Sequence, residues 1–197
     1  MNKKAMEVLE AIKTRRSIRH YKPGFVDEDK INAVLEAARW APSWANTQCW
    51  KLIVVKDEAI KARLAETLTL GNPASSAVRQ APVVIVACAE LGKSGFEQSV
   101  PSTDKGDWYM FDVALGMQNL VLAAHSLGLG TVHIGAFNAQ AVAKILKVPP
   151  GVAVVEMTPL GYPEREGKTP CRKELFELVF YEVYGQKRKC PQGDSNP

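Results

Sequence analysis

Three arginines and a serine stand together near the start of the chain, in the segment Arg15-Arg16-Ser17-Ile18-Arg19. Arginine binds phosphate oxygens bidentately and stays charged, so this composition suits a dianionic phosphate. Alternate residues of an extended segment face the same side, so Arg15, Ser17 and Arg19 are expected to face one ligand. Ile18 should then pack inward. A solvated helix end is the alternative interpretation, because cations there complement the helix dipole.

A second group of polar residues follows about two dozen positions later, in the loop Pro42-Ser43-Trp44-Ala45-Asn46-Thr47-Gln48 and the adjoining Cys49. Hydroxyl and amide groups crowd this loop, and Pro42 ends the helix that precedes it. The thiol of Cys49 would be reactive only with a lowered pKa, so we expect it to be inert.

The remaining candidate groups carry weaker signals. Gly128-Leu129-Gly130 follows a helix and precedes a strand, which is the reverse of the dinucleotide-binding order, so a helix stop is expected there. Gly135-Ala136 is a turn of small residues where backbone N–H groups could approach a ligand closely. His133 lies next to this turn. No Cys/His grouping has zinc spacing, and we expect no metal site.

The composition limits the classes of protein to which the chain could belong. With 197 residues and 46% hydrophobic residues, one domain with a packed core is expected. A formal net charge of +4 is too small and scattered to indicate nucleic-acid binding. The longest apolar run, residues 82–89, is far shorter than the ~20 residues that span a bilayer. Without a C-x-x-C pair or a signal-peptide core, the expected location is the cytoplasm.

Hydrophobic periodicity and Gly/Pro breakers predict two helices before the first strand, so the chain is not a run of βαβ units. The apolar run 82–89 indicates a strand that is buried on both faces. Residues 91–106 should form a surface loop or lid, residues 175–183 an apolar segment, and residues 186–197 a polar tail. The predicted helices are 4–14, 27–41, 57–70, 107–127 and 138–147, and the predicted strands are 52–55, 82–89, 131–134 and 152–160.

In this order, the motifs resemble the FMN-dependent nitroreductase family over about residues 5–184. Supporting segments are residues 112–129, 131–137, 161–163 and 172–173; one departure is Cys49, where the family usually has proline. The resemblance implies an α+β, nitroreductase-like fold with a central mixed β-sheet flanked by helices. It also implies one domain over residues 1–185, and a homodimer in which the C-terminal tail extends onto the partner subunit.

The resemblance further implies a role for each residue of the basic segment. Arg15, Ser17 and Arg172 would hold the FMN phosphate, and Arg16 would contribute mainly through its backbone. Arg19 would lie near N1 and O2 of the flavin, where a fixed cation stabilises the reduced ring.

The other implied cofactor contacts come from the polar loop and the small turn. Asn46 would hydrogen-bond the flavin edge, and Pro42 and Ser43 would reach the FMN that is bound mainly by the partner subunit. Gly135-Ala136 would present backbone N–H groups to N5 and O4, and Ile134 would pack beside the ring.

The implied activity is that of a flavoprotein oxidoreductase, with ping-pong transfer of a hydride from NAD(P)H through FMN N5 to a nitroaromatic, a quinone or a similar small-molecule acceptor. The cofactor carries the chemistry, so no side-chain acid or base is required. Two alternatives stay open. One is specialised flavin chemistry on the same fold, such as dehalogenation or flavin breakdown, although residues 91–108 hold no evident halotyrosine clamp. The other is a flavin-binding module without enzymatic activity.

Overall fold

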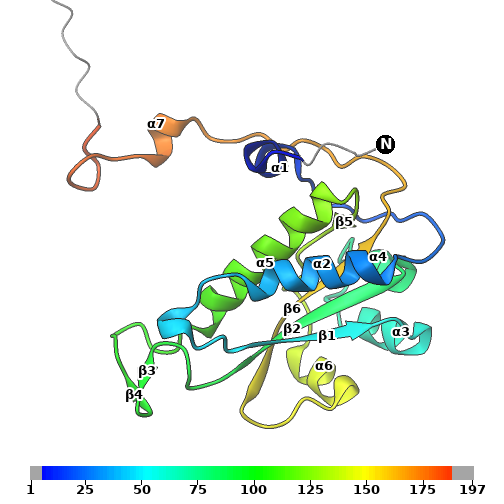
Figure 1. Cartoon of the computed structure of the whole chain (residues 1–197), viewed down its shortest axis with the longest axis horizontal. Helices are drawn as coiled ribbons and strands as arrows, with labels where there is room; N and C mark the ends of the chain where they lie inside the picture. Colours follow the sequence, from blue (N-terminus) through cyan, green and yellow to red (C-terminus); the bar gives the residue numbers. More distant parts are fainter. Residues whose placement is uncertain (1–5, 188–197) are drawn as a thin grey trace, which may run out of the picture. The chain divides into compact units, whose positions relative to one another are not determined.

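The computed structural model describes residues 6–187, which divide into two units at Gly167 and Lys168. The first unit carries the β-sheet and all but one of the described helices (Figure 1). The second contains the short helix α7 (Leu175–Leu178). The single domain predicted over residues 1–185 stays a prediction, and residues 188–197 of the predicted tail lie outside the described residues.

A four-stranded sheet forms the centre of the first unit, with strand order β1-β2-β6-β5 and antiparallel pairing throughout. Within residues 6–187, the one parallel pairing that touches the sheet is an isolated bridge between Ser17 and Thr131. The predicted mixed character of the sheet is confined to this bridge. The strands are β1 (Trp50–Val55), β2 (Val83–Glu90), β5 (Gly130–Thr131) and β6 (Val152–Gly161).

Strand β2 is buried on both faces, as its continuous apolar run predicts. Alternate side chains of a strand point to opposite faces, so Val83 and Ile85 enter one hydrophobic cluster while Val84 and Val86 enter another. The helices on the two sides of the sheet supply the rest of each cluster. α2 (Glu28–Arg39) and α5 (Tyr109–Ser126) cover the first face, whereas α3 (Glu58–Glu66), α4 (Ser75–Gln80) and α6 (Ala139–Leu146) cover the second.

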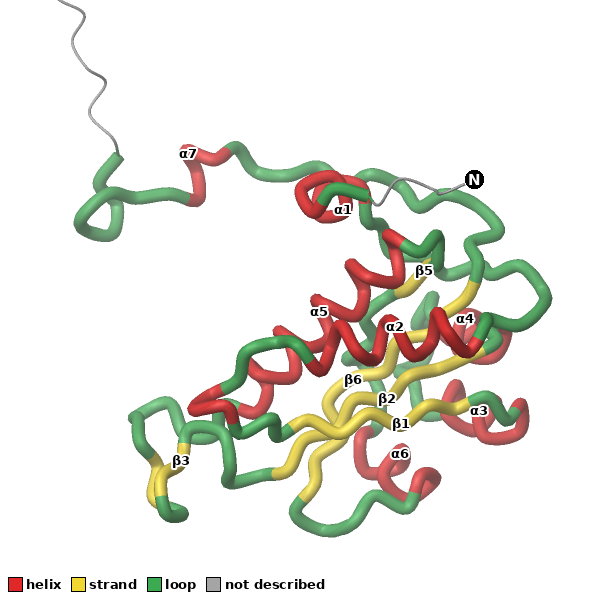
Figure 2. Tube along the Cα trace, viewed as in Figure 1, coloured by secondary structure: helices red, strands yellow, loops and turns green. Residues whose placement is uncertain are grey.

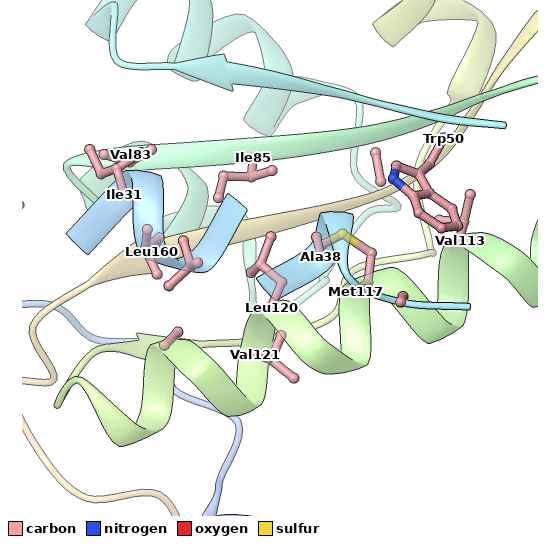
Figure 3. Packing of buried hydrophobic residues seen from close by; sticks show 14 of the residues in the cluster. Ile31, Ala38, Trp50, Val83, Ile85, Val113, Met117, Leu120, Val121 and Leu160 are labelled. Atoms are coloured by element: carbon pink, nitrogen blue, oxygen red, sulfur yellow. The ribbon is translucent and has the colours of Figure 1, made fainter. Parts of the chain in front are cut away.

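Helix α5 is the longest helix of the described chain, and Figure 3 shows its apolar side against α2 and the sheet. Met117, Leu120 and Val121 are essentially inaccessible to solvent, and Leu120 lies near Ile85 of the sheet. Burial of a side chain of this size contributes about 1.5–3 kcal/mol to the free energy of unfolding. Packing against α2 and the sheet therefore holds α5 in place. The helix runs from the hairpin β3–β4 (Phe96–Glu97 and Val100–Pro101) to β5 (Figure 2).

Several boundaries differ from the sequence prediction. The helix predicted over residues 57–70 ends at Glu66, because Leu68 pairs with Phe137 in an antiparallel bridge and the Thr67 carbonyl accepts from Asn138 N–H. Helix α4 was not predicted, and the predicted loop 91–106 contains the small hairpin β3–β4. α1 (Val8–Thr14) begins later than predicted, with residues 4 and 5 outside the described range. Strand β1 begins at 50 rather than 52, and β5 ends at 131 rather than 134.

No helix within residues 6–187 combines the length and apolar character needed to cross a membrane.

Candidate functional site

The basic segment is held along the edge of the sheet by its backbone. Ser17 forms the parallel bridge with Thr131, and Ile18 N–H donates to the Thr131 carbonyl oxygen at 2.8 Å. Ile18 is only 8% exposed, as the alternation predicts. Gly130 permits this approach, because a Cβ atom there would lie 2.8 Å from Cβ, Cγ1 and Cγ2 of Ile18. Gly130 therefore does more than follow the helix stop; the left-handed φ of 77° that ends α5 belongs to Gly128.

The same segment continues against the end of strand β6. Lys22 N–H donates to the Tyr162 carbonyl at 2.8 Å, and Glu164 N–H donates to the His20 carbonyl at 3.0 Å. Tyr21 is buried between these contacts, and its hydroxyl donates to the Ile18 carbonyl at 2.8 Å. Burial raises the pKa of Tyr21, so this phenol is a neutral structural donor. The backbone on both sides of Arg19 is thus fixed.

The three arginines of the segment have different surroundings. Nη1 of Arg16 donates to the carbonyl oxygens of Lys13 and Arg15, each at 2.7 Å, which ties this side chain to the end of α1. Nε of Arg19 is buried and has no hydrogen-bond partner among the described residues. Burial, together with the charges of Arg15 and Arg16, lowers the pKa of His125 on α5. The C-terminal end of α5 therefore faces a concentrated positive charge.

The loop over residues 42–49 is conformationally strained. Ala45, Asn46 and Gln48 all have left-handed backbone conformations, with φ of 43°, 56° and 48°. Such conformations are costly for non-glycine residues and persist where surrounding contacts impose them. One of these contacts is the hydrogen bond from Gln48 N–H to Ser43 Oγ, at 2.9 Å. Pro42 and Asn46 are exposed, and Ser43 is half-buried.

The interior of this loop meets the first turn of α5. The buried carboxylate of Asp112 accepts from Trp44 N–H at 3.1 and 3.2 Å and contacts the thiol of Cys49 at 3.7 Å. Burial, followed by the nearby Asp112 charge, raises the pKa of Cys49 to about 11, so this thiol is protonated at neutral pH. Oγ1 of Thr47 is the second buried side-chain polar atom without a hydrogen-bond partner within residues 6–187.

The small turn after β5 is fixed on its carbonyl side. Ile134 is buried and exchanges two backbone hydrogen bonds with Met157 of β6, at 2.9 and 3.0 Å. The Ala136 carbonyl accepts from Thr69 N–H at 3.2 Å and from Asn72 Nδ2 at 3.3 Å. Within residues 6–187, the N–H groups of Gly135 and Ala136 donate no hydrogen bond. The turn therefore offers two backbone N–H donors, while hydrogen bonds to the Ala136 carbonyl hold the turn in place.

His133 precedes this turn and has an acidic partner. Its Nδ1 lies 2.9 and 3.1 Å from the two carboxylate oxygens of Glu156 on β6, and both side chains are partly accessible. The pair fixes the orientation of the imidazole ring one residue before Ile134.

These features form two groups at opposite ends of α5. Thr14, directly before the basic segment, forms a hydrogen bond with His125 at 2.8 Å, whereas the loop 42–49 contacts Asp112. Asp112 and His125 are thirteen residues apart on one helix, which is about 20 Å at a rise of about 1.5 Å per residue. The basic segment and the turn at Gly135 share one region of the sheet edge; the loop with Pro42, Ser43 and Asn46 does not lie in it.

Arg172 is an exposed residue of the second unit, where it donates to the Cys171 carbonyl at 3.3 Å.

The family model described as "Nitroreductase family" matches residues 12–77 and 65–162 of this chain. A protein of Methanothermobacter thermautotrophicus, provisionally named NADH dehydrogenase/NAD(P)H nitroreductase, is 36% identical over 87% of this chain and 84% of its own length. The chain belongs to the nitroreductase family. The family predicted from the sequence motifs is thereby confirmed.

Solved structures agree with this family membership. The nitroreductase family protein of Clostridium novyi NT is 34% identical, has a TM-score of 0.73, and aligns over 92% of this chain and 97% of its own. A Desulfovibrio desulfuricans nitroreductase-type protein, solved in complex with FMN, is 28% identical with a TM-score of 0.75, over 91% of this chain and 98% of its own. The predicted α+β, nitroreductase-like fold is confirmed for this member of the family.

Three site features of this nitroreductase-family protein were not predicted. Asp112 stands in an apolar helix, and only its charge among buried neighbours distinguishes it in the sequence. Asn72 follows the helix predicted over residues 57–70, and nothing in its sequence context indicates that its Nδ2 donates to the Ala136 carbonyl. Thr47 lies inside a predicted motif, but nothing in its sequence context indicates that its hydroxyl is buried and unpaired.

Proposed function

We propose that this protein is an FMN-dependent oxidoreductase that oxidises NAD(P)H and passes the electrons to a nitroaromatic, a quinone or a similar small acceptor. The observation that carries the proposal is the position of the two unpaired buried polar atoms of the described chain. Nε of Arg19 lies in one predicted cofactor motif and Oγ1 of Thr47 in the other. Buried polar groups in native proteins are nearly always paired, so such atoms indicate a ligand.

The basic segment suits the phosphate end of FMN. Arg15 is half-buried and Ser17 is exposed, and both stand on a backbone that is fixed by Thr131. Guanidinium and hydroxyl donors on a fixed backbone lose little entropy when they bind a dianion. We assign the phosphate to Arg15 and Ser17, with Arg16 contributing through its backbone because its side chain is engaged by α1. Arg172 belongs to the second unit, and its predicted role stays an expectation from the family resemblance.

Arg19 suits the ring end of the cofactor. Its Nε is a buried donor that lacks an acceptor, and the backbone on either side is held by Ile18 and His20. A guanidinium in this position would donate to the pyrimidine edge of the flavin, near N1 and O2, and its positive charge would stabilise negative charge there. The N–H groups of Gly135 and Ala136 would donate to N5 and O4, and Ile134 would pack beside the ring. FMN, when bound, accepts and donates the hydride, and these residues orient it.

The separation of the two motifs favours a site shared between two copies of the chain. Within one chain, about 20 Å of helix α5 lies between them. The helix α1 exposes more than half of Val8, Leu9 and Ile12, and the first turn of α5 exposes Met110 and Phe111 to the same degree. Apolar surface of this kind marks a protein interface. In a homodimer, Pro42, Ser43 and Asn46 would reach the FMN that is bound by the basic segment of the partner subunit.

The relatives support the choice of nucleotide and cofactor. A Bacillus subtilis relative that is 31% identical over 83% of this chain and 69% of its own length is named FMN reductase [NAD(P)H]. The Desulfovibrio desulfuricans relative is solved with FMN. We extend both properties to this chain on the strength of the site described above.

The proposal is tested by a titration of the purified protein with FMN, followed by steady-state assays with NADH and NADPH. We expect quenching of flavin fluorescence at one FMN per subunit, and NAD(P)H oxidation that depends on added quinone or nitroaromatic acceptor. A protein that does not take up FMN would refute the proposal. FMN binding without any NAD(P)H oxidation would favour a binding module, and oxidation that is indifferent to both acceptors would favour specialised flavin chemistry.

A further inference from the structure

The carboxylate of Asp112 joins three separate parts of the chain. It is fully buried in the first turn of α5 and accepts from Trp44 N–H at 3.1 and 3.2 Å, from Ser94 Oγ at 2.7 Å and from Cys49 Sγ at 3.7 Å. Hydrogen bonds to an ionised acceptor are stronger than those between neutral groups, and a buried carboxylate without them would be strongly destabilising. These three donors are therefore required partners of Asp112.

Two of the donors come from the ends of the strained loop. Trp44 begins the short 3-10 helix Trp44–Asn46, and Cys49 directly precedes strand β1. The left-handed residues Ala45, Asn46 and Gln48 lie between these two anchors. A backbone that holds three such residues relaxes unless its ends are fixed. The Asp112 contacts supply this fixation at both ends.

The third donor comes from the base of the hairpin β3–β4. Ser94 is fully buried, and its carbonyl accepts from Trp108 N–H at 3.0 Å. The next residue, Gly95, has a φ of 83°, and a Cβ atom there would lie 2.6 Å from Cδ1 of Trp108 and 2.7 Å from the Gly106 carbonyl. The base of the hairpin is thus packed tightly, so that the Ser94 hydroxyl has a defined position toward Asp112.

Aromatic contacts also link the loop to the start of α5, in addition to the hydrogen bonds of the Asp112 carboxylate. The rings of Trp44 and Trp108 are 5.2 Å apart between centroids, and Trp108 is at the same distance from Phe111. Nε1 of Trp108 donates to Thr103 Oγ1, two residues after the end of the hairpin, at 3.1 Å. The loop and the base of the hairpin therefore both contact the start of α5, and Asp112 is the group that both share.

We propose that Asp112 is a positioning residue, which holds the loop 43–49 in the conformation that the cofactor site needs and ties it, through Ser94, to the base of the hairpin β3–β4. The part of this inference that concerns FMN rests on the proposed function. Asp112 is not among the proposed cofactor contacts, and its proposed action is through the backbone of Trp44. A consequence is that a change in the hairpin, outside the cofactor contacts, alters the affinity for FMN.

The test compares Asp112→Ala, Asp112→Asn and Ser94→Ala with the wild-type protein. Ser126→Ala is the matched control, because it also removes a serine hydroxyl but stands at the other end of α5, where it bonds the Ala123 carbonyl. Two readouts are measured: amide hydrogen exchange of the segment 43–49 in cofactor-free protein, and the Kd for FMN. The exchange readout is independent of FMN.

For Asp112→Ala we expect exchange of the loop at least about tenfold faster and a Kd for FMN about tenfold higher, as the loss of one charge-assisted hydrogen bond network implies. Asp112→Asn should fall between this variant and the wild type, since its Oδ1 still accepts from Trp44 N–H. Ser94→Ala should raise both quantities by about threefold or more, while Ser126→Ala leaves both within about twofold of wild type.

If amide exchange of the segment 43–49 in Asp112→Ala equals that of the wild type, the positioning role is overturned. If Asp112→Ala does not fold, the same comparison with Ser94→Ala decides the question. Faster exchange with an unaltered Kd for FMN would overturn its link to the cofactor. If the wild-type protein binds no FMN, the proposed function fails instead, and the exchange measurement still decides the role of Asp112.

Discussion

Ser17 pairs with Thr131 in a parallel bridge, and the next backbone N–H donates to the Thr131 carbonyl at 2.8 Å. This pairing sets a segment from near the N-terminus beside the strand that leads to the turn at Gly135. Arginine side chains and backbone donors thereby share one edge of the sheet, although they are far apart in the sequence. The proposed site depends on this juxtaposition more than on either motif alone.

The close approach at Gly130 predicts a stability effect. In Gly130→Ala the new Cβ would lie 2.8 Å from three atoms of Ile18, so the basic segment must shift, and we expect a loss of about 1–3 kcal/mol in the free energy of unfolding. Gly135→Ala is the matched control for stability, because its Cβ meets nothing within 4 Å, and it should stay within about 0.5 kcal/mol. Denaturant unfolding at one fixed protein concentration measures both; equal stabilities would contradict the packing described here.

The two ends of the basic segment should respond differently to substitution. Arg15→Ala should weaken FMN binding by about 10- to 100-fold, because it removes charge-assisted bonds to the phosphate. Titration with FMN measures this, and an unchanged Kd would remove Arg15 from the phosphate site.

Arg19→Ala should lower the midpoint potential of the bound flavin. A fixed positive charge favours the more negative oxidation state, and a loss of ~1.4 kcal/mol corresponds to about 30 mV for a two-electron couple. Arg19→Lys keeps the charge and should recover most of the shift, though not the planar donor geometry. Potentiometric titration of FMN-loaded variants provides the values. A potential in Arg19→Ala equal to that of wild type would refute the role assigned to this residue.

The shared site predicts complementation between defective subunits. Arg15→Ala and Asn46→Ala alter motifs that lie at opposite ends of helix α5 in the single chain, so each homodimer should bind FMN weakly. In a randomly mixed population, about one quarter of the sites combine two unaltered halves, one from each subunit, and should recover wild-type affinity. Co-expression with two different tags and an FMN titration measures this fraction. A mixture that binds FMN no better than the average of its parents would show that both motifs serve the same subunit's site.

The cysteines should differ in reactivity. Burial raises the pKa of Cys49 and of Cys88 to about 11, and for Cys49 the Asp112 charge adds to this, whereas Cys171 is exposed. Near pH 8, roughly one in a thousand of the buried thiols would be ionised, so iodoacetamide should label Cys171 at least 100-fold faster than Cys49 or Cys88. Labelling of Cys49 should increase only as the pH rises toward 11. Peptide mass spectrometry resolves the sites, and rapid labelling of Cys49 near pH 8 would contradict its burial.

Local patterns predicted much of the fold. The alternation of the basic segment predicts an inward Ile18, and the continuous apolar run predicts a strand buried on both faces; both are observed. Asn138 begins the helix predicted over residues 138–147, and as the N-cap of α6 its Oδ1 accepts from Ala141 N–H at 3.0 Å. These features depend on neighbours within a few residues, which the sequence displays directly.

Contacts between distant segments account for what the sequence did not predict. The helix predicted to residue 70 ends early because Leu68 pairs with Phe137, a partner that helical periodicity cannot indicate. Likewise, Asp112 receives a hydrogen bond from Trp44, 68 positions earlier in the chain. Hydrophobic periodicity also predicts the first helix, whose apolar residues Val8 and Leu9 are exposed in the single chain. Periodicity identifies an apolar face, but not what covers it.

The most direct test of the proposed function is an anaerobic titration of the FMN-loaded protein with NADH and, separately, with NADPH. We expect at least one nucleotide to bleach the visible flavin absorbance at one equivalent per FMN, and a quinone or nitroaromatic acceptor then to restore it. A flavin that stays oxidised in excess of both nucleotides would refute the proposed function, even in a protein that binds FMN tightly.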